Sequence, residues 1–358
     1  MKPDARTGTV GWQSPANIAL VKYWGKHGNQ LPANPSVSMT LSRSVTTTRL
    51  TWSPADTSPG IQFLFDGNPN ESFETRIKSY LESVKSRLPF LSSYNLIIES
   101  SNSFPHSSGI SSSASFMSSL ALCLCEMESV LSGQTDLNNE FYHRVSLLSR
   151  LGSGSASRSV YGKYALWGSF PSAEGSSDEF AIPVNHLVHP VFLDFRDAVL
   201  VVSSKPKPLS SSAGHALMNA NPFANARYDS ARNNLARMLA ALREGDLDSF
   251  CTLLEEEALT LHGLILASQG GKILMEPGTL SIISRIRQFR LETGIPVAFT
   301  LDAGPNVHVL YPAAHQAAIR KFIEEELCHF CEEGKWIDDE AGDGPIRLEL
   351  PAGPHPTD

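Results

Sequence analysis

The first fifty residues alternate between apolar and polar side chains, which is the period-two pattern of strands with one buried face. The alternation is clearest where Val37, Met39 and Leu41 are separated by serine and threonine residues. Asp66-Gly67 lies inside a second alternating stretch, and this dipeptide is typical of a hairpin turn. We therefore expect short strands and turns over residues 7–52 and a hairpin at Asp66-Gly67.

A helical period replaces the alternation further along the first half. Residues 71–88 place Phe73, Ile77, Tyr80, Leu81 and Val84 on one face. Residues 95–100 then resemble a strand that runs into a loop of small residues at 104–109. The helix expected after this loop has an apolar stripe that consists of Phe116, Leu120, Leu124 and Met127. The polar segment 171–179 is expected to be a surface loop near the end of the first domain.

The second half of the chain has a more regular pattern. Residues 198–202 are a run typical of a buried strand, and 297–301 and 307–310 are two further strands joined by a turn at 302–306. No repeat of 20 to 50 residues is visible. Helices are expected over 224–244, over 246–268 with Asp246 or Asp248 as the N-cap, and over 278–290 with an end at Gly294.

The length of the chain favours two domains. Its 358 residues exceed one ordinary hydrophobic core, so we expect domains over 1–192 and 193–358 with a cleft between them. The apolar content of 41% and the charged content of 18% are those of a globular protein. We see no apolar run that approaches the length of a bilayer span and no secretory signal at the start, and we therefore expect a cytoplasmic protein.

Charge and cysteine content narrow the function classes. The net charge of −8 comes without an arginine-rich or lysine-rich tract, which argues against binding to nucleic acid or anionic membranes. Five cysteines scattered over the chain are typical of reduced thiols. Cys328 and Cys331 form one C-x-x-C pair, but no second pair completes a zinc site, so ordinary cysteines are favoured.

The serine-rich loop over residues 105–115 is the first candidate for chemistry. Small residues allow an anion to approach the backbone, a helix start offers unpaired N–H groups, and serine hydroxyls can donate to phosphate or help to hold magnesium. A Walker A loop would end in Gly-Lys-Ser/Thr, which is absent here. Taken alone, such a loop is more often a helix N-cap than a phosphate site.

Four charged residues in unusual surroundings are further candidates. Lys22 and Lys26 lie in or beside an apolar run, where an ammonium group requires an anionic partner unless it reaches solvent from a strand edge. Arg158 ends the small-residue segment 152–159, which is either an anion-binding loop or a flexible linker. Asp302 begins a turn after a strand, where it either caps that turn or acts as a base.

Taken together, these motifs resemble the diphosphomevalonate decarboxylase family over nearly the whole chain. The motifs are Asn17-Ile18-Ala19-x-x-Lys22-Tyr23-Trp24-Gly25-Lys26, Phe104-Pro105 with its serine-rich loop, Gly152-Ser153-Gly154-Ser155-Ala156-x-Arg158-Ser159, and Asp302-Ala303-Gly304-Pro305-Asn306. That family belongs to the kinases named for galactokinase, homoserine kinase, mevalonate kinase and phosphomevalonate kinase. The resemblance implies an α+β protein with an α/β N-terminal domain, a ferredoxin-like C-terminal domain and an active site in the cleft between them. It also implies ATP and Mg²⁺ as cofactors and a homodimer.

The resemblance also implies a role for each candidate residue. Asp302 would act on the tertiary hydroxyl as a base or orienting group, Lys22 would lie between that hydroxyl and the γ-phosphate, and Arg158 would bind the substrate carboxylate. The implied product is isopentenyl diphosphate. Substrate binding is implied for Tyr23, Lys26, Ser153, Ser155 and Ser212, ATP phosphate binding for Ser107, Ser108, Gly109, Ser111, Ser112 and Ser113, and metal binding for Ser112.

Some positions depart from the family pattern. His27-Gly28 stands where many members have Arg-Asp, Phe116 replaces a glycine, and Ser212 stands where some bacterial members have an arginine near the diphosphate. These departures leave three alternatives open: a decarboxylase for the 5-monophosphate, a kinase that stops at the 3-phosphate, and a non-catalytic ligand sensor on the same fold.

Overall fold

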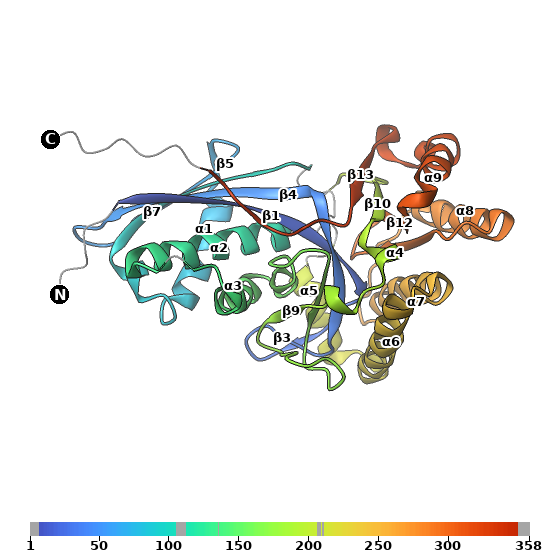
Figure 1. Ribbon diagram of the computed structural model, residues 1–358, viewed down its shortest axis with the longest axis horizontal. Helices are drawn as coiled ribbons and strands as arrows, with labels where there is room; N and C mark the ends of the chain where they lie inside the picture. Colours follow the sequence, from blue (N-terminus) through green and yellow to red (C-terminus); the bar gives the residue numbers. More distant parts are fainter. Residues whose placement is uncertain (1–6, 105–111, 135, 206–208, 210, 350–358) are drawn as a thin grey trace.

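The computed structural model describes residues 7–104, 112–134, 136–205, 209 and 211–349, with the backbone alone for Ser211 and Ser212. Two β-sheets and their helices lie along the long axis of the molecule (Figure 1). The first sheet contains residues from the N-terminal half and one late strand, and the second contains residues from the C-terminal half. This mixed architecture agrees with the α+β, two-domain expectation.

The first sheet has eight strands, in the order β14-β1-β4-β7-β5-β6, with β8 paired to β4 and β9 to β8. Its neighbours are antiparallel except for β5 and β7. The small sheet β2 (Lys26–His27) with β3 (Leu31–Pro32) lies apart. The eight strands are β1 (Gly8–Val21), β4 (Ser36–Pro54), β5 (Ile61–Phe65), β6 (Asn68–Pro69), β7 (Tyr94–Asn102), β8 (Tyr164–Trp167), β9 (Ala181–Pro183) and β14 (Ile346–Arg347).

Strand β4 is buried on both faces along its first six residues. Val37, Met39 and Leu41 are buried, as the alternation predicts, but the intervening Ser36 and Ser38 are also fully buried. These hydroxyls bond to the Arg158 guanidinium and do not face solvent. The polar positions of the alternating pattern therefore mark a buried polar site in this strand.

Helix α2 (Ser112–Ser132) packs against β1 and β4 through hydroxyl groups as well as apolar side chains. Ser115 and Ser119 bond to Thr46 and Thr48 at 2.6 Å each. The predicted stripe is buried, as is most of the rest of the helix. Helix α2 is long and apolar enough to cross a membrane, contrary to the expectation that no such stretch exists, but 72% of its apolar window is buried inside the fold.

Two more helices cover the first sheet. Helix α1 (Glu71–Val84) begins at the Asn70 N-cap and ends four residues before the predicted residue 88. Helix α3 (Asn139–Gly152), capped by the Asn138 side chain, was not among the predicted elements. The predicted hairpin is confirmed, because Asp66 and Gly67 connect β5 to β6 with positive φ angles of 48° and 77°.

The second sheet is antiparallel, in the order β11-β12-β10-β13. One face packs against α8 and α9, and the other against α6, α7 and the first sheet. The strands and helices of this half, including the short helices α4 before β10 and α5 after it, are β10 (Phe195–Leu200), β11 (Ala298–Leu301), β12 (Val307–Pro312), β13 (Trp336–Glu340), α4 (Pro190–Leu193), α5 (Ser211–Ala216), α6 (Ala224–Glu244), α7 (Leu247–Leu266), α8 (Pro277–Thr293) and α9 (Gln316–Phe322).

The predicted helices of the second half are largely confirmed. Helix α6 has the expected bounds, α7 begins at the Asp246 N-cap, and α8 ends at Gly294 in a left-handed conformation. Strand β10 begins at Phe195, three residues before the predicted start. Leu280, in the first turn of α8, is 54% exposed.

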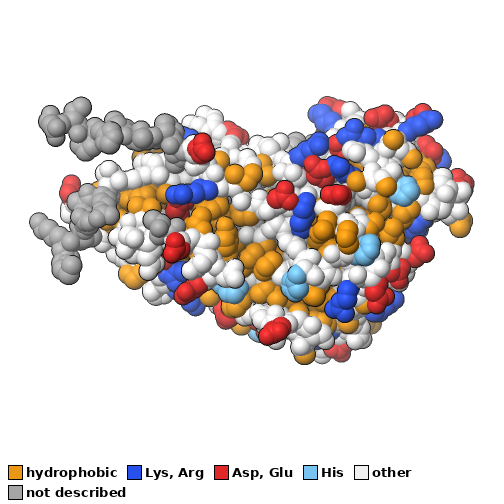
Figure 2. Space-filling model, in the orientation of Figure 1, with side chains coloured by type: hydrophobic (Ala, Val, Ile, Leu, Met, Phe, Trp, Pro, Cys, Tyr) orange, Lys and Arg blue, Asp and Glu red, His pale blue; other side chains and the backbone are white. Residues whose placement is uncertain are grey.

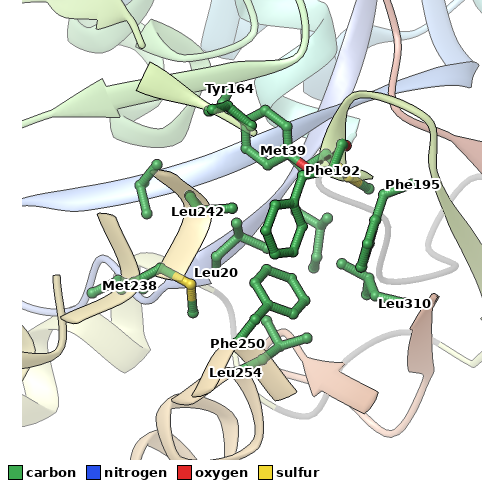
Figure 3. Close-up of a cluster of buried hydrophobic side chains, with 14 of the residues drawn as sticks. Leu20, Met39, Tyr164, Phe192, Phe195, Met238, Leu242, Phe250, Leu254 and Leu310 are labelled. Carbon is green, nitrogen blue, oxygen red and sulfur yellow. Dashed lines mark hydrogen bonds between the residues drawn. The ribbon is translucent and has the colours of Figure 1, made fainter. Parts of the chain in front are cut away.

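A single hydrophobic cluster joins the two sheets (Figure 3). Leu20 and Met39 come from the first sheet, Leu310 from the second, and Phe250 and Leu254 from α7. All five side chains are at most 1% exposed. The ends of β1 and β4 are therefore fixed against α7 and the second sheet by apolar packing.

The C-terminal strand returns to the first sheet. Strand β14 pairs with β1 through Trp12 and Arg347, so the chain crosses from the second sheet back to the first (Figure 1). The predicted domain boundary near residue 193 stays a prediction. Strand β14 lies after this boundary in the sequence but belongs to the first sheet. On the face shown in Figure 2, basic and acidic side chains are interspersed over the C-terminal helices.

Candidate active site

Lys22 and Asp302 lie 280 positions apart in the sequence and form an ion pair. Lys22 is the first residue after β1, and Asp302 is the first residue after β11. The distance between Lys22 Nζ and Asp302 Oδ1 is 3.3 Å, with side-chain exposures of 2% and 24%. The meeting of the two sheets therefore places a buried ammonium group beside a carboxylate that solvent still reaches.

Burial and neighbouring charges set the protonation of Lys22. Burial lowers the pKa of Lys22, and the Asp302 carboxylate opposes this shift through its charge and hydrogen bond. The Glu257 charge also raises the pKa of Lys22, and the Arg158 charge lowers it. The two carboxylates thus favour the charged lysine in a site where desolvation favours the neutral amine.

Arg158 is buried next to this pair and has only neutral hydrogen-bond partners among the described residues. Its guanidinium donates to Ser36 Oγ at 2.6 Å, to Ser38 Oγ at 3.0 Å and to Asn17 Oδ1 at 3.4 Å. The side chain is 2% exposed, and burial lowers the pKa of Arg158 to about 10. A buried cation that is held by neutral groups favours an anionic ligand, because desolvating an unpaired charge is costly.

Tyr23 packs against the small-residue segment that carries Ser153 and Ser155. A Cβ on Gly154 would lie 2.9 Å from the Tyr23 hydroxyl oxygen, so glycine allows this close approach. The hydroxyl is buried and has no hydrogen-bond partner among the residues that the structure describes, and burial raises the pKa of Tyr23. Ser153 Oγ and Ser155 Oγ are 3.4 Å apart. These three hydroxyl groups form a compact polar group beside Arg158.

The start of α2 reaches the same segment. Ser113 Oγ lies 3.3 Å from Ser153 Oγ, and Ser112 is the first residue of the helix. Hydroxyls and N–H groups at a helix start are suited to a phosphate and its metal ion. Among the described residues, no group of three His, Cys, Asp or Glu side chains could hold a metal. Ser107, Ser108, Gly109 and Ser111 lie outside the described residues.

Lys26 lies at the edge of this region and lines a pocket of about 530 Å³. Its ammonium donates to Gln30 Oε1 at 2.8 Å, and burial lowers the pKa of Lys26. Tyr228 and Arg232 of α6 line the same pocket. Ser212 is in α5, but its side chain lies outside the described residues, so its predicted contact with substrate stays a prediction.

The cysteine pair is separate from this region. All five cysteines are free thiols, and Cys328 and Cys331 lie at the short 3-10 helix η7 (Cys328–Phe330). Burial raises the pKa of both thiols, that of Cys331 to about 12.

Three residues beside the candidate site were not identified from the sequence. His262 Nε2 lies 2.9 Å from the backbone oxygen of Asp302. Glu257 accepts the backbone N–H of Lys22 at 2.9 Å. His215 Nδ1 accepts the N–H of Gly25 at 2.9 Å and packs against the Tyr23 and Trp24 rings. The helical period gives a partial signal for the first two, because Glu257 and His262 lie four residues from the apolar Leu261 and Ala258, which indicates a buried position but not the partners.

Comparison with known protein families covers most of the chain. The model of the diphosphomevalonate decarboxylase-like N-terminal domain matches residues 14–178. The model of the mevalonate 5-diphosphate decarboxylase C-terminal domain matches residues 198–344. Diphosphomevalonate decarboxylase from Eremothecium gossypii is 30% identical over 330 residues, which are 87% of this chain and 79% of that protein. The enzyme of the same name from Ganoderma lucidum is 30% identical over 88% of this chain and 81% of its own length.

Solved structures give the same result. Mevalonate diphosphate decarboxylase from Staphylococcus aureus has a TM-score of 0.82 and 28% identity, covering 96% of this chain and 99% of that one. A structure described as "MDDEF in complex with MVAPP, AMPPCP and Magnesium" has a TM-score of 0.80 and 28% identity, covering 96% of this chain and all of that chain.

Proposed function

The chain belongs to the diphosphomevalonate decarboxylase family, and we propose that it catalyses the ATP-dependent decarboxylation of mevalonate 5-diphosphate in isoprenoid biosynthesis. The products would be isopentenyl diphosphate, ADP, phosphate and carbon dioxide. The observation that carries the proposal is the convergence of Lys22, Asp302 and Arg158, which supplies two buried cations and one carboxylate for a small anionic hydroxy acid.

The reaction begins at the tertiary hydroxyl of the substrate. Asp302 accepts the hydroxyl proton or orients the hydroxyl. The hydroxyl oxygen of the substrate attacks the γ-phosphorus of ATP, and ADP leaves. Lys22 lies beside Asp302 and offers its positive charge to the phosphoryl group during transfer. Phosphorylation turns a poor leaving group into a good one.

The second stage breaks two bonds of the phosphorylated intermediate. Phosphate departs with the electron pair of the C–O bond, and the carbon that it leaves becomes electron-poor. The C–C bond to the carboxylate then breaks, carbon dioxide leaves, and the electron pair forms the new C=C bond. Any proton that Asp302 accepted in the first stage passes to the departing phosphate, so the carboxylate is again negative and stabilises the cationic carbon, while Arg158 orients the substrate carboxylate until it departs.

The remaining candidate residues fit the phosphate groups of the two substrates. Tyr23, Lys26, Ser153 and Ser155 provide hydroxyls and an ammonium for the diphosphate of mevalonate. Ser112 and Ser113 begin α2 beside Ser153, where they would contact ATP phosphates. When bound, magnesium would neutralise phosphate charge there, with the Ser112 hydroxyl as a candidate ligand. The cytoplasmic location and the homodimer stay predictions.

Substitution of Asp302 tests the proposed chemistry. Asp302→Asn keeps the shape of the side chain and removes its charge, so we expect kcat to fall by about 10²–10⁴ with little change in KM. Carbon dioxide and ADP are measured together in the steady state. A normal kcat with a large rise in KM would assign Asp302 to substrate binding alone.

A further inference from the structure

The backbone of Lys22 is held by side chains, because the residue lies just beyond the end of β1. The ladder between β1 and β4 ends with Val21 paired to Val37. The N–H group of Lys22 donates to Glu257 Oε2 at 2.9 Å. Its carbonyl oxygen accepts from Asn34 Nδ2 at 3.0 Å. The peptide groups on both sides of the Lys22 Cα are therefore held by side chains of other segments and not by the β1–β4 ladder.

Glu257 is itself locked in position by neighbours on α6. Its Oε2 accepts from Arg227 Nη2 at 2.6 Å, and its Oε1 accepts from Asn234 Nδ2 at 2.9 Å. The side chains of Glu257 and Arg227 are 0% and 1% exposed. Arg227 Nη2 also lies 3.5 Å from the Lys22 carbonyl oxygen. This buried pair therefore connects α6 and α7 to the backbone of Lys22.

Helix α7 carries a second contact of the same kind, five residues after Glu257. His262 Nε2 bonds to the backbone oxygen of Asp302 at 2.9 Å. One helix thus contacts the main chain of both members of the Lys22–Asp302 ion pair. The distance between ammonium and carboxylate depends on where α7 holds the two backbones.

We propose that Glu257, locked by Arg227, is a positioning residue that fixes the backbone of Lys22, and that α7 sets the spacing of Lys22 and Asp302 through Glu257 and His262. The inference rests on the proposed function, in which these two side chains act on one phosphoryl transfer. Such a transfer is sensitive to placement, because a shift of about 1 Å in a catalytic group can lower the rate roughly 100-fold.

Two double variants test the proposal while avoiding an unpaired buried charge. Arg227→Met with Glu257→Gln removes both charges but keeps an acceptor for the Lys22 N–H. Arg227→Met with Glu257→Leu removes the charges and the acceptor together. Replacing a buried ion pair by neutral side chains often leaves a protein folded, which thermal unfolding checks for both variants. The two proteins then differ at one side chain of similar size.

We expect kcat of the leucine variant to be about 10- to 100-fold below that of the glutamine variant, with KM values for both substrates within about twofold. Turnover is measured as ADP formed, with carbon dioxide followed in parallel. Equal kcat in the two variants, whether at the wild-type level or reduced alike, would overturn the proposal. A wild-type protein that forms ADP without carbon dioxide would instead contradict the proposed function.

Glu255 provides a matched control on the same helix. It is a buried carboxylate of α7 that pairs with Arg287 at 2.8 Å and Arg290 at 2.6 Å, both on α8. Glu255→Gln should lower the melting temperature and leave kcat unchanged. A loss of kcat in Glu255→Gln equal to that of the leucine variant would show that general weakening of α7 is the cause, which would also overturn the proposal.

Discussion

Individual residues of the site combine charge with low exposure to solvent. Arg158 and Lys22 are each 2% exposed, and beside them lies one partly exposed carboxylate, Asp302, while the charge of the buried Glu257 is balanced by Arg227. This leaves an excess of positive charge in a buried region, which is the condition for binding a multiply charged anion. The cost of burying these groups is offset by fixed hydroxyl and amide partners and, in the proposed complex, by the substrate.

The shape of the Arg158 side chain leads to a prediction at this scale. Lysine in its place has one ammonium and cannot reach Ser36, Ser38 and a substrate carboxylate together. We expect Arg158→Lys to raise KM for the acid by about 10- to 100-fold, which corresponds to the loss of one charge-assisted bond. Steady-state kinetics with ATP in excess measures this. Unchanged constants would remove Arg158 from the site.

His215 predicts how stability depends on pH. Burial, together with the charge of Lys26, lowers the pKa of His215 to about 3 from its ordinary 6.5. The unfolded chain therefore binds a proton on His215 at a higher pH than the folded chain does. The contribution of neutral His215 to stability is fully present above about pH 6.5 and is lost as the pH falls towards 3. His215→Gln keeps an acceptor for the Gly25 N–H and does not titrate.

We therefore expect the melting temperature of the wild type to fall more steeply between pH 6.5 and pH 4 than that of His215→Gln. The exposed His186, replaced by Gln, serves as the control and should follow the wild type. Parallel curves for wild type and His215→Gln would show that His215 does not titrate differently in the folded and unfolded states.

The sequence predicts some of these residues and not others, for physical reasons. Asp302 and Arg158 lie in motifs that resemble a family, and such motifs are visible without knowing any contact. Glu257 belongs to a run of three glutamates, which is usually a solvated face, yet it is fully buried beside Arg227. Its partner comes from another helix, and a local pattern does not contain that pairing.

At the scale of elements, strand β14 fixes a buried carboxylate between helix and sheet. Glu126 of α2 accepts hydrogen bonds from Trp12 Nε1 on β1 and from Arg347 Nε on β14, the latter at 2.7 Å. The Glu126 side chain is 4% exposed, whereas that of Arg347 is 59% exposed. Through Arg347, the short edge strand β14 therefore pairs with the Glu126 carboxylate, which is buried between the first sheet and α2.

Removing this contact should destabilise the protein without touching the site. Arg347→Ala leaves Glu126 with Trp12 as its remaining side-chain partner among those recorded, at a cost of about 1–3 kcal/mol. For a chain of this length we expect the melting temperature to fall by about 1–4 °C. Lys85→Ala, which breaks an exposed pair with Glu82, should change stability by less than about 1 kcal/mol. Equal effects of the two substitutions would contradict the structural role of β14.

Element prediction succeeded for the long helices of the second half and failed for one helix of the first half. Helices α6, α7 and α8 were predicted from their apolar positions and, for α7 and α8, from end signals at Asp246 and Gly294, whereas α3 was missed although the Asn138 side chain caps it and one of its faces is buried. Helix α2 was predicted from one stripe but is buried around most of its surface, because serine hydroxyls replace apolar contacts on the sheet side. Its serine-rich start is thus partly a packing surface and partly a candidate phosphate site.

At the scale of the whole molecule, the function depends on bringing the two halves of the chain together. Lys22 follows a strand of the first sheet, Asp302 follows a strand of the second, and the cluster in Figure 3 joins the two sheets. The hydrophobic pattern predicts each half separately, and the meeting of residues 22 and 302 followed from the family resemblance. A contact between residues so far apart depends on the complete packing of both sheets and α7.

The most direct test of this account measures the products formed with three substrates. Purified protein is incubated with magnesium and ATP and, separately, with mevalonate, its 5-phosphate and its 5-diphosphate, while carbon dioxide, ADP and free phosphate are measured. We predict that the 5-diphosphate gives the three products in equal amounts, because each turnover breaks one phosphoryl bond and one carbon–carbon bond. Two results would contradict the proposed decarboxylation of the 5-diphosphate. One is ADP formed without carbon dioxide or free phosphate, and the other is carbon dioxide released faster from the 5-phosphate than from the 5-diphosphate.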